Sequence, residues 1–143
     1  MKRIVLGVDG SDGSIQAARV AGRLTADLGA ELTAVHVRHV APMAWSPAPA
    51  AVASNPEETL GAIEELARKR TAQALDPLDI PWTFQVRAGD PAAELEQAAA
   101  EQGADLIIVG SQGHTVVERL ILGSVSTRLT HQAQRPVMVV PLT

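Results

Sequence analysis

A chain of 143 residues with 46% hydrophobic and 20% charged side chains fits one globular domain, and we take 1–143 as that domain. The absence of cysteine excludes disulfides and thiol catalysis. A net charge of −4 and only two tryptophans and one phenylalanine argue against nucleic-acid binding. The apolar runs are too short for a membrane helix or a signal peptide, so we expect no membrane association and a cytoplasmic location.

The N-terminal segment predicts a strand followed by a helix. The apolar run Arg3–Val8 ends at DGSDG, a cluster of turn and cap residues. Ser11 or Ser14 is a suitable N-cap, and Gly29 is a suitable stop. The apolar positions between them recur every three or four residues, as on one face of a helix: Ile15, Ala18, Ala21, Leu24 and Leu28.

The next segment predicts a strand, a connection and a second helix. Valine-rich Leu32–Val40 is typical of a buried strand. Residues 41–54 combine alanine with three prolines and have no periodic face, so we expect an extended connection or lid. Asn55 as N-cap, with proline next and Glu58 completing a capping box, begins a helix that continues to about Ala74.

The C-terminal half continues the alternation of strands and helices. The expected elements are a strand at Trp82–Val86, a helix between Asp90 and Gly103, a strand at Leu106–Val109, a helix over 124–134 and a strand at Val137–Val140. Strands alternating with helices predict an α/β fold, in which an open parallel sheet of five strands carries helices on both faces.

Ligands of such sheets bind beyond the carboxyl ends of the strands, and two of these ends have suitable sequences. Asp9-Gly-Ser follows the first strand, and Gly110-Ser-Gln-Gly follows the fourth. Glycine allows positive φ and close approach of a ligand, and Gly123-Ser124 opens a helix whose first amides can face an anion. We infer phosphate binding; the alternative is that these glycines only form turns and that Ser124 only caps a helix.

The stricter nucleotide signatures are absent. A P-loop needs a lysine after its second glycine, but Lys2 and Lys69 lie far from both turns, and GxGxxG is missing. Phosphate charge would therefore be balanced by a divalent metal, by Arg119 or Arg128, or by backbone dipoles. The sequence predicts at most weak hydrolysis.

Other candidate groups favour structural roles. His36 and His39 are three apart on a strand and point to opposite faces, while His114 and His131 lie on other elements, so we expect no dedicated metal site. Ser11 and Ser14 fit capping better than nucleophilic catalysis. The Asp9 carboxylate either contacts a ligand or fixes its own loop through nearby N–H groups.

The spacing of Gly110, Gly113, Gly123 and Ser124 resembles the ATP-binding motif of the universal stress protein family, G-2x-G-9x-G-S. The resemblance extends over nearly the whole chain, through VDGSDGS, AVHV, AGDPAAEL, ADLIIVGSQG and LILGSVSTRLTHQAQRPVMVVP. It implies a Rossmann-like sheet of the adenine nucleotide alpha hydrolase-like type, in the order 3-2-1-4-5. The nucleotide would lie between the ends of the first and fourth strands.

The resemblance also implies a ligand and a set of contacts. The ligand is ATP, with ADP or AMP as alternatives, bound with Mg²⁺ or Mn²⁺ through its phosphates. Asp9 would contact ribose and phosphate, and Val37 would lie on the adenine side. Gln112 stands where many relatives have a basic residue. The full set of candidate binding residues is Gly7, Val8, Asp9, Ser11, Val37, Gly110, Ser111, Gly113, His114, Gly123, Ser124, Val125 and Ser126.

The resulting hypothesis is an ATP-binding, nucleotide-responsive regulator in stress response, with a protein partner that the sequence does not identify. Pairing of Val137–Val140 across a two-fold axis would make it a homodimer. Two alternatives remain: a slow ATPase or adenylyl-transfer enzyme of the same architecture, and a nucleotide-free dimeric interaction module.

Overall fold

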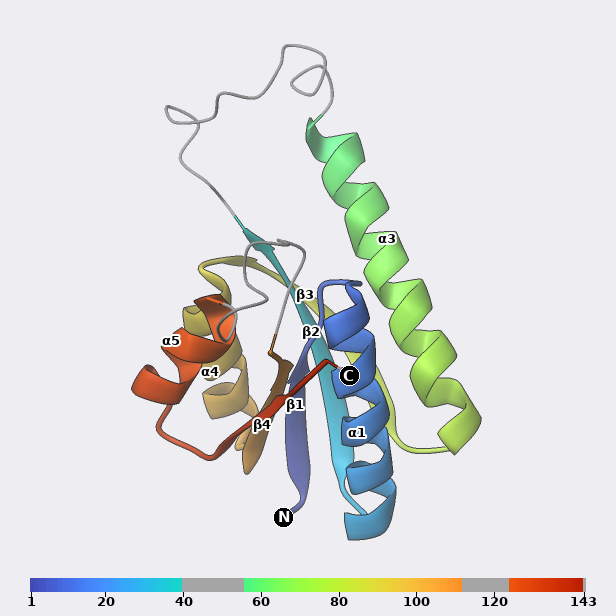
Figure 1. The fold of residues 1–143 in the computed structure, drawn as a ribbon, viewed down its shortest axis with the longest axis vertical. Coiled ribbons are helices and arrows are strands. Elements are labelled where there is room, and N and C mark those ends of the chain that lie inside the picture. The colour runs from blue at the N-terminus through green and yellow to red at the C-terminus, as the bar shows by residue number, and fades with distance from the viewer. Residues whose placement is uncertain (40–55, 112–123, 143) are drawn as a thin grey trace.

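The structure is a computed structural model that describes residues 1–39, 56–111 and 124–142. Its five strands form one parallel sheet in the order β3-β2-β1-β4-β5, which confirms the predicted architecture (Figure 1). In chain order the elements are β1 (Arg3–Gly7), α1 (Asp12–Leu28), β2 (Glu31–His39), α3 (Pro56–Leu75), the 3₁₀ turn η2 (Asp76–Leu78), β3 (Trp82–Gly89), α4 (Pro91–Gln102), β4 (Leu106–Gly110), α5 (Ser124–Gln132) and β5 (Val137–Val140).

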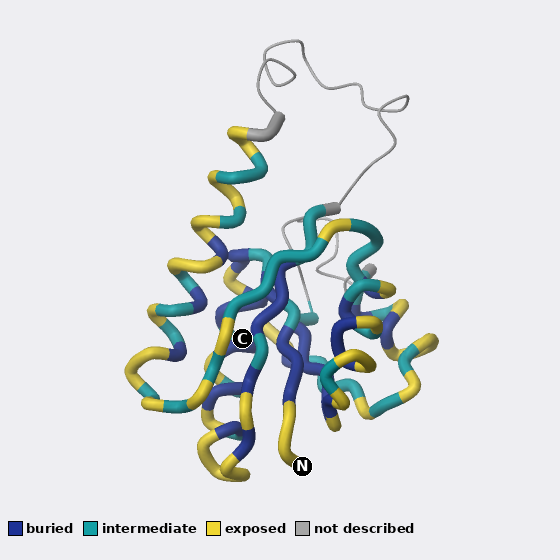
Figure 2. The backbone as a smooth tube through the Cα atoms, turned by 180° about the vertical axis from the view of Figure 1, so that it is seen from behind, coloured by how far each residue is buried: buried dark blue, intermediate teal, exposed yellow. Residues whose placement is uncertain are grey.

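The helices cover both faces of the sheet, with α1 and α3 on one face and α4 and α5 on the other (Figure 1). Alternate residues of each central strand therefore enter different cores. Leu6 and Ile108 pack with α1, whereas Val5 and Ile107 pack with α4 and α5. The central strands are accordingly the most deeply buried part of the chain (Figure 2). Because helices cover these strands on both faces, their sequences are continuous apolar runs.

Capping residues set the ends of α1 and α4 as the sequence predicts. The Ser11 and Asp90 side chains accept the backbone N–H of the residue three positions later. Gly29 and Gly103 end these helices in the left-handed conformation, with φ of 63° and 64°. Short polar caps and terminal glycines are local signals, so these helix ends could be predicted closely.

Some predicted boundaries were wrong by a few residues. β3 continues past Val86 to Gly89, because its pairing with β2 runs on to the register His39↔Gly89. β1 ends at Gly7 instead of Val8, and α5 ends at Gln132 instead of Gln134.

The predicted 41–54 connection and the N-cap Asn55 lie outside the described residues. None of the helices within the described ranges combines the length and hydrophobicity that crossing a lipid bilayer requires.

Two buried threonines on neighbouring helices provide a test of hydrogen bonding in the core. Thr71 of α3 is fully buried, and its hydroxyl has no hydrogen-bond partner among the described residues. We expect Thr71→Val to leave stability unchanged or raise it by up to about 1 kcal/mol, because the desolvated hydroxyl is removed. Thermal unfolding measures this effect.

Thr25 of α1 is the matched control. It is equally buried, but its hydroxyl donates to the Ala21 carbonyl at 2.7 Å. Thr25→Val should therefore cost about 1 kcal/mol. Equal losses of melting temperature in the two variants would contradict the prediction.

Asp105 anchors the start of β1 and should contribute pH-dependent stability. Its carboxylate accepts the Lys2 N–H at 2.7 Å and the Arg3 N–H at 3.2 Å. These bonds, that from Lys2 first, lower the pKa of Asp105 below its ordinary value of 3.8. A lowered folded-state pKa gives stability that is fully present above the unfolded value and is lost as the pH falls through the folded one.

We therefore expect Asp105→Asn to destabilise the protein at pH 7, with a difference from wild type that shrinks below about pH 4. Urea unfolding at pH 7 and pH 3 measures both differences. Asp27→Asn is the control, since Asp27 is exposed and forms no hydrogen bond with the described residues. If the free energy of unfolding of wild type exceeds that of Asp105→Asn by the same amount at pH 7 and pH 3, the charge of the carboxylate is not the cause of the difference.

Candidate functional site

The strand order reverses direction between β1 and β4, the two central neighbours of the sheet. The chain leaves β1 for α1 on one face, and the helix that follows β4 in sequence, α5, covers the other (Figure 1). Such a switch point at the carboxyl ends of parallel strands is where open α/β sheets bind ligands. The candidate site is therefore built from the turns that follow β1 and β4 and from the start of α5.

The turn after β1 is ordered by its own polar side chains. Oδ1 of Asp9 accepts the Ser11 N–H at 2.9 Å and also the Ser11 hydroxyl. The same Ser11 oxygen accepts the Ser14 N–H at 3.2 Å and so caps α1. The loop-fixing role considered for Asp9 is thus present. It leaves the Asp9 carboxylate fixed at the end of β1, whatever else that group contacts.

Residues of β2 also form hydrogen bonds with the backbone of this turn. The Val8 N–H donates to the Val35 carbonyl at 2.9 Å, and Nδ1 of His36 lies 3.0 Å from the Val8 carbonyl. Because a carbonyl can only accept, Nδ1 is assigned the proton. Val8 is buried and both of its backbone polar groups are engaged, so it supports the site from within the core.

Helix α3 also holds the turn after β1, through Arg70. The Arg70 guanidinium donates to the Gly10 carbonyl and, at 2.9 Å, to the Asp12 carboxylate. Gly10 has φ of +82°, and a Cβ there would lie 3.4 Å from the Cα of Ala67. Gly10 is therefore where positive φ and close helix packing are both needed. The sequence analysis missed Arg70 because nothing local to α3 shows which loop it reaches.

Gly110 and Gly7 have a packing role that the sequence analysis did not predict. Neither has positive φ, which corrects the expectation for Gly110. A Cβ on Gly110 would lie 2.7 Å from the Gly13 carbonyl oxygen, and one on Gly7 would lie 2.9 Å from Leu95 Cδ1. These glycines let α1 and α4 approach the ends of the central strands closely. Their packing role accounts for glycine there without a ligand.

The start of α5 brings further candidate residues to the site. Ser124 is its first residue, and Ser126 in the first turn is 1% exposed. Val125 and Val37 both pack against the core cluster on the α4 and α5 face. The two predicted apolar contacts therefore belong to the same face of the sheet.

Two other residues that were predicted to contact the ligand already bond to other groups of the protein. The Ser111 N–H donates to the Val140 carbonyl at 2.9 Å. Arg128, considered for phosphate charge, pairs with the Asp90 carboxylate at the start of α4. Four candidates lie outside the described residues: Gly113, His114, Arg119 and Gly123. Within the described ranges, no three His, Asp or Glu side chains group closely enough to hold a metal ion.

A parallel sheet in this order, with helices on both faces and a switch point between β1 and β4, defines an open α/β protein of the Rossmann-like type. The chain belongs to the universal stress protein family, because the model of the Universal stress protein family matches residues 1–141.

Individual relatives agree with this assignment. A universal stress protein of Methanocaldococcus jannaschii is 34% identical over 146 residues, covering 97% of this chain and 81% of the relative. The structure of the universal stress protein UspA from Lactobacillus plantarum superposes with a TM-score of 0.79 at 23% identity, covering 97% of each chain. A universal stress protein solved in complex with cAMP superposes with a TM-score of 0.69 at 26% identity, covering 99% of this chain and 98% of the other.

Proposed function

We propose that this chain, acting as one domain over 1–143, binds an adenine nucleotide at the carboxyl edge of β1 and β4. ATP is the expected ligand, with ADP and AMP as alternatives. The observation that carries the proposal is the rigid turn after β1, where Asp9 is fixed at the switch point by Ser11 while His36 and Arg70 fasten the backbone behind it. A relative that is 26% identical was solved with cAMP, which supports an adenine nucleotide as the ligand class.

The chain offers each part of the nucleotide a suitable group. The first turn of α5 favours phosphate, because a helix N-terminus carries partial positive charge. The Asp9 carboxylate is suited to accept hydrogen bonds from ribose hydroxyls. Val37 and Val125 supply apolar surface for the base. Mg²⁺ or Mn²⁺ would be held through the phosphates, since no protein cluster of metal ligands exists among the described residues.

The proposed role is that of a regulator in stress response, not a turnover enzyme. Nucleotide binding would shift the population of conformations that a protein partner meets. β5 lies at the edge of the sheet with Val137, Met138 and Val139 half-buried, which supports a homodimer that pairs this edge. The proposed location is the cytoplasm. A slow ATPase or adenylyl-transfer enzyme is the alternative, and turnover above about one per second would favour it.

Calorimetric titration of the purified protein with ATP, ADP and AMP tests the proposal. Replacement of Gly113 and Ser124 with bulky side chains should abolish binding while circular dichroism stays unchanged. Gly61→Ala in α3 serves as control, since its added Cβ meets no atom within 4 Å. Failure of the wild-type protein to bind any of the three nucleotides, or full affinity in the bulky variants, would defeat the assignment.

A further inference from the structure

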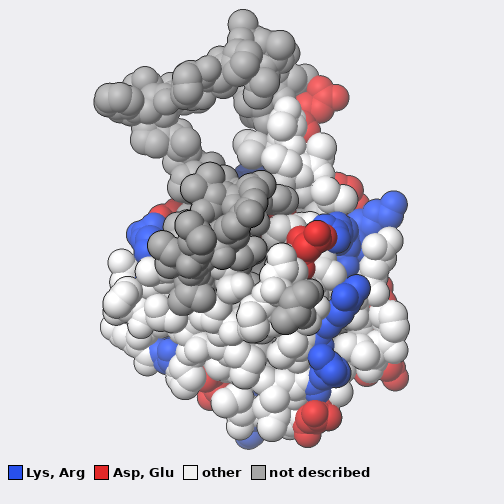
Figure 3. Space-filling model, viewed as in Figure 1, with Lys and Arg blue, Asp and Glu red and all other residues white. Residues whose placement is uncertain are grey.

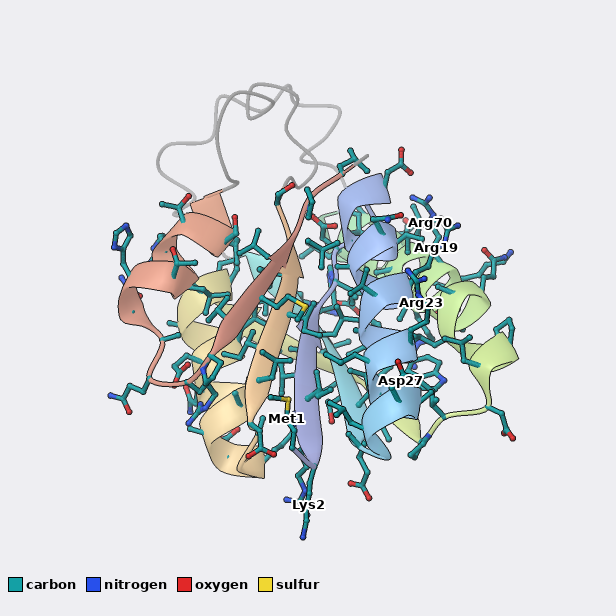
Figure 4. The ribbon with its side chains drawn as sticks, turned by 60° about the horizontal axis from the view of Figure 1, so that its bottom comes forward. Met1, Lys2, Arg19, Arg23, Asp27 and Arg70 are labelled. Carbon is teal, nitrogen blue, oxygen red and sulfur yellow. The ribbon has the colours of Figure 1, made fainter. Side chains whose placement is uncertain are left out.

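We propose that Arg70, Arg19 and Arg23, hereafter the arginine row, form a docking surface for an acidic segment of a partner protein. The three side chains follow the outer side of α1 toward its junction with α3, in the order in which Figure 4 labels them. Figure 3 shows the same feature as a run of basic atoms down one side of the molecule. The proposal does not depend on nucleotide binding.

Helix geometry aligns the row. Asp12, Arg19 and Arg23 are separated by seven and four residues, which places them within an arc of about 40° around the axis of α1. Asp12 holds the Arg70 guanidinium at 2.9 Å, so Arg70 stands at the N-terminal end of the same face. The row therefore extends for roughly 16 Å, at 1.5 Å per helical residue.

Two members of the row have no carboxylate to pair with. Arg19 and Arg23 are exposed, and within the described part of the chain no carboxylate lies within the 4.0 Å of an ion pair. Like charges four residues apart on a helix cost about 0.2–0.5 kcal/mol. Arg38, Arg87 and Arg135, by contrast, are each bonded to a glutamate. The arginine row is thus a local positive surface on a chain of net charge −4, with Asp12 at one end and Asp27, four residues beyond Arg23, at the other.

The chemistry of the row favours carboxylates as its occupants. A guanidinium presents a planar fork of donors that matches a carboxylate, and Arg70 already holds one, that of Asp12. A helical segment with carboxylates at positions i, i+7 and i+11 would place one acid opposite each arginine. Nucleic acid fits less well, since the described aromatics, Trp82 and Phe84, lie on β3, and Arg68 already covers the Phe84 ring at 4.5 Å.

Titration with a decaglutamate peptide at about 20 mM salt, followed by NMR, tests the proposal. We expect shifts at the Nε–H signals of the arginine row, and weaker binding as salt rises, because salt screens exposed charges. Arg23→Glu should weaken binding about tenfold, since it replaces an attraction with a repulsion. Lys2→Glu is the matched charge reversal; Figure 4 shows Lys2 below the sheet, apart from the row.

The outcomes separate the possibilities. Equal weakening by Lys2→Glu and Arg23→Glu would mean that only net charge matters and would overturn the docking surface. Decathymidine that binds as tightly as decaglutamate would overturn the assignment to a protein partner. The melting temperature of each variant is measured beside its affinity, so that unfolding does not imitate lost binding; Lys2→Glu should lower it slightly, because it places a second carboxylate beside Asp105. Nucleotide affinity, measured separately, reports on the proposed function alone.

Discussion

Gly110→Ala is expected to destabilise the protein by about 2–3 kcal/mol and to lower its nucleotide affinity. The added Cβ would lie 2.7 Å from the Gly13 carbonyl oxygen and 2.8 Å from the Gly13 carbonyl carbon. Both are backbone atoms of the first turn of α1, which cannot move without shifting the loop that carries Asp9. Urea unfolding measures the stability, and titration of the folded variant with ATP measures the affinity.

Gly61→Ala is the control for the same chemical change. Gly61 lies within α3, and an added Cβ there meets no atom within 4 Å. Alanine is the better helix former, so this variant should gain about 0.5–1 kcal/mol. If Gly110→Ala is as stable as Gly61→Ala, the close approach of β4 to α1 is not what requires glycine at position 110.

The sequence predicts the fold well because its signals are local. Apolar runs such as Leu106–Val109 are typical of strands buried on both faces, and Ser11, Gly29 and Asp90 cap helices through neighbours a few residues away. The family resemblance, which the family match confirms, adds the strand order, which the structure confirms. Pattern and family together therefore fix the architecture.

The candidate site could be predicted only in outline, because its support comes from residues distant in sequence. Arg70 reaches the Gly10 carbonyl across 60 positions, and His36 reaches the Val8 carbonyl across 28. The sequence considered His36 only as a metal ligand. It also assigned Gly110 to ligand approach, whereas the atoms nearest to it belong to α1. Tertiary packing decides such roles, and no local pattern encodes it.

Ile108→Ala is expected to cost about 2–5 kcal/mol, as for other buried isoleucines. Ile108 is fully buried on β4, where it packs with Leu6 in the core beneath α1. Because β4 lies between β1 and β5, the strand cannot shift to fill the cavity without breaking its pairing with them. Chemical unfolding of the purified variant measures the loss.

Ile63→Ala gives the same truncation on the surface. Ile63 of α3 is 39% exposed, so little apolar area returns to water, and alanine is the better helix former. We expect a change within about 0.5 kcal/mol of wild type. The contrast between the two variants measures how far stability depends on the central strands. A loss at Ile63 comparable to that at Ile108 would instead mean that this side chain is covered in solution by a surface outside the described residues.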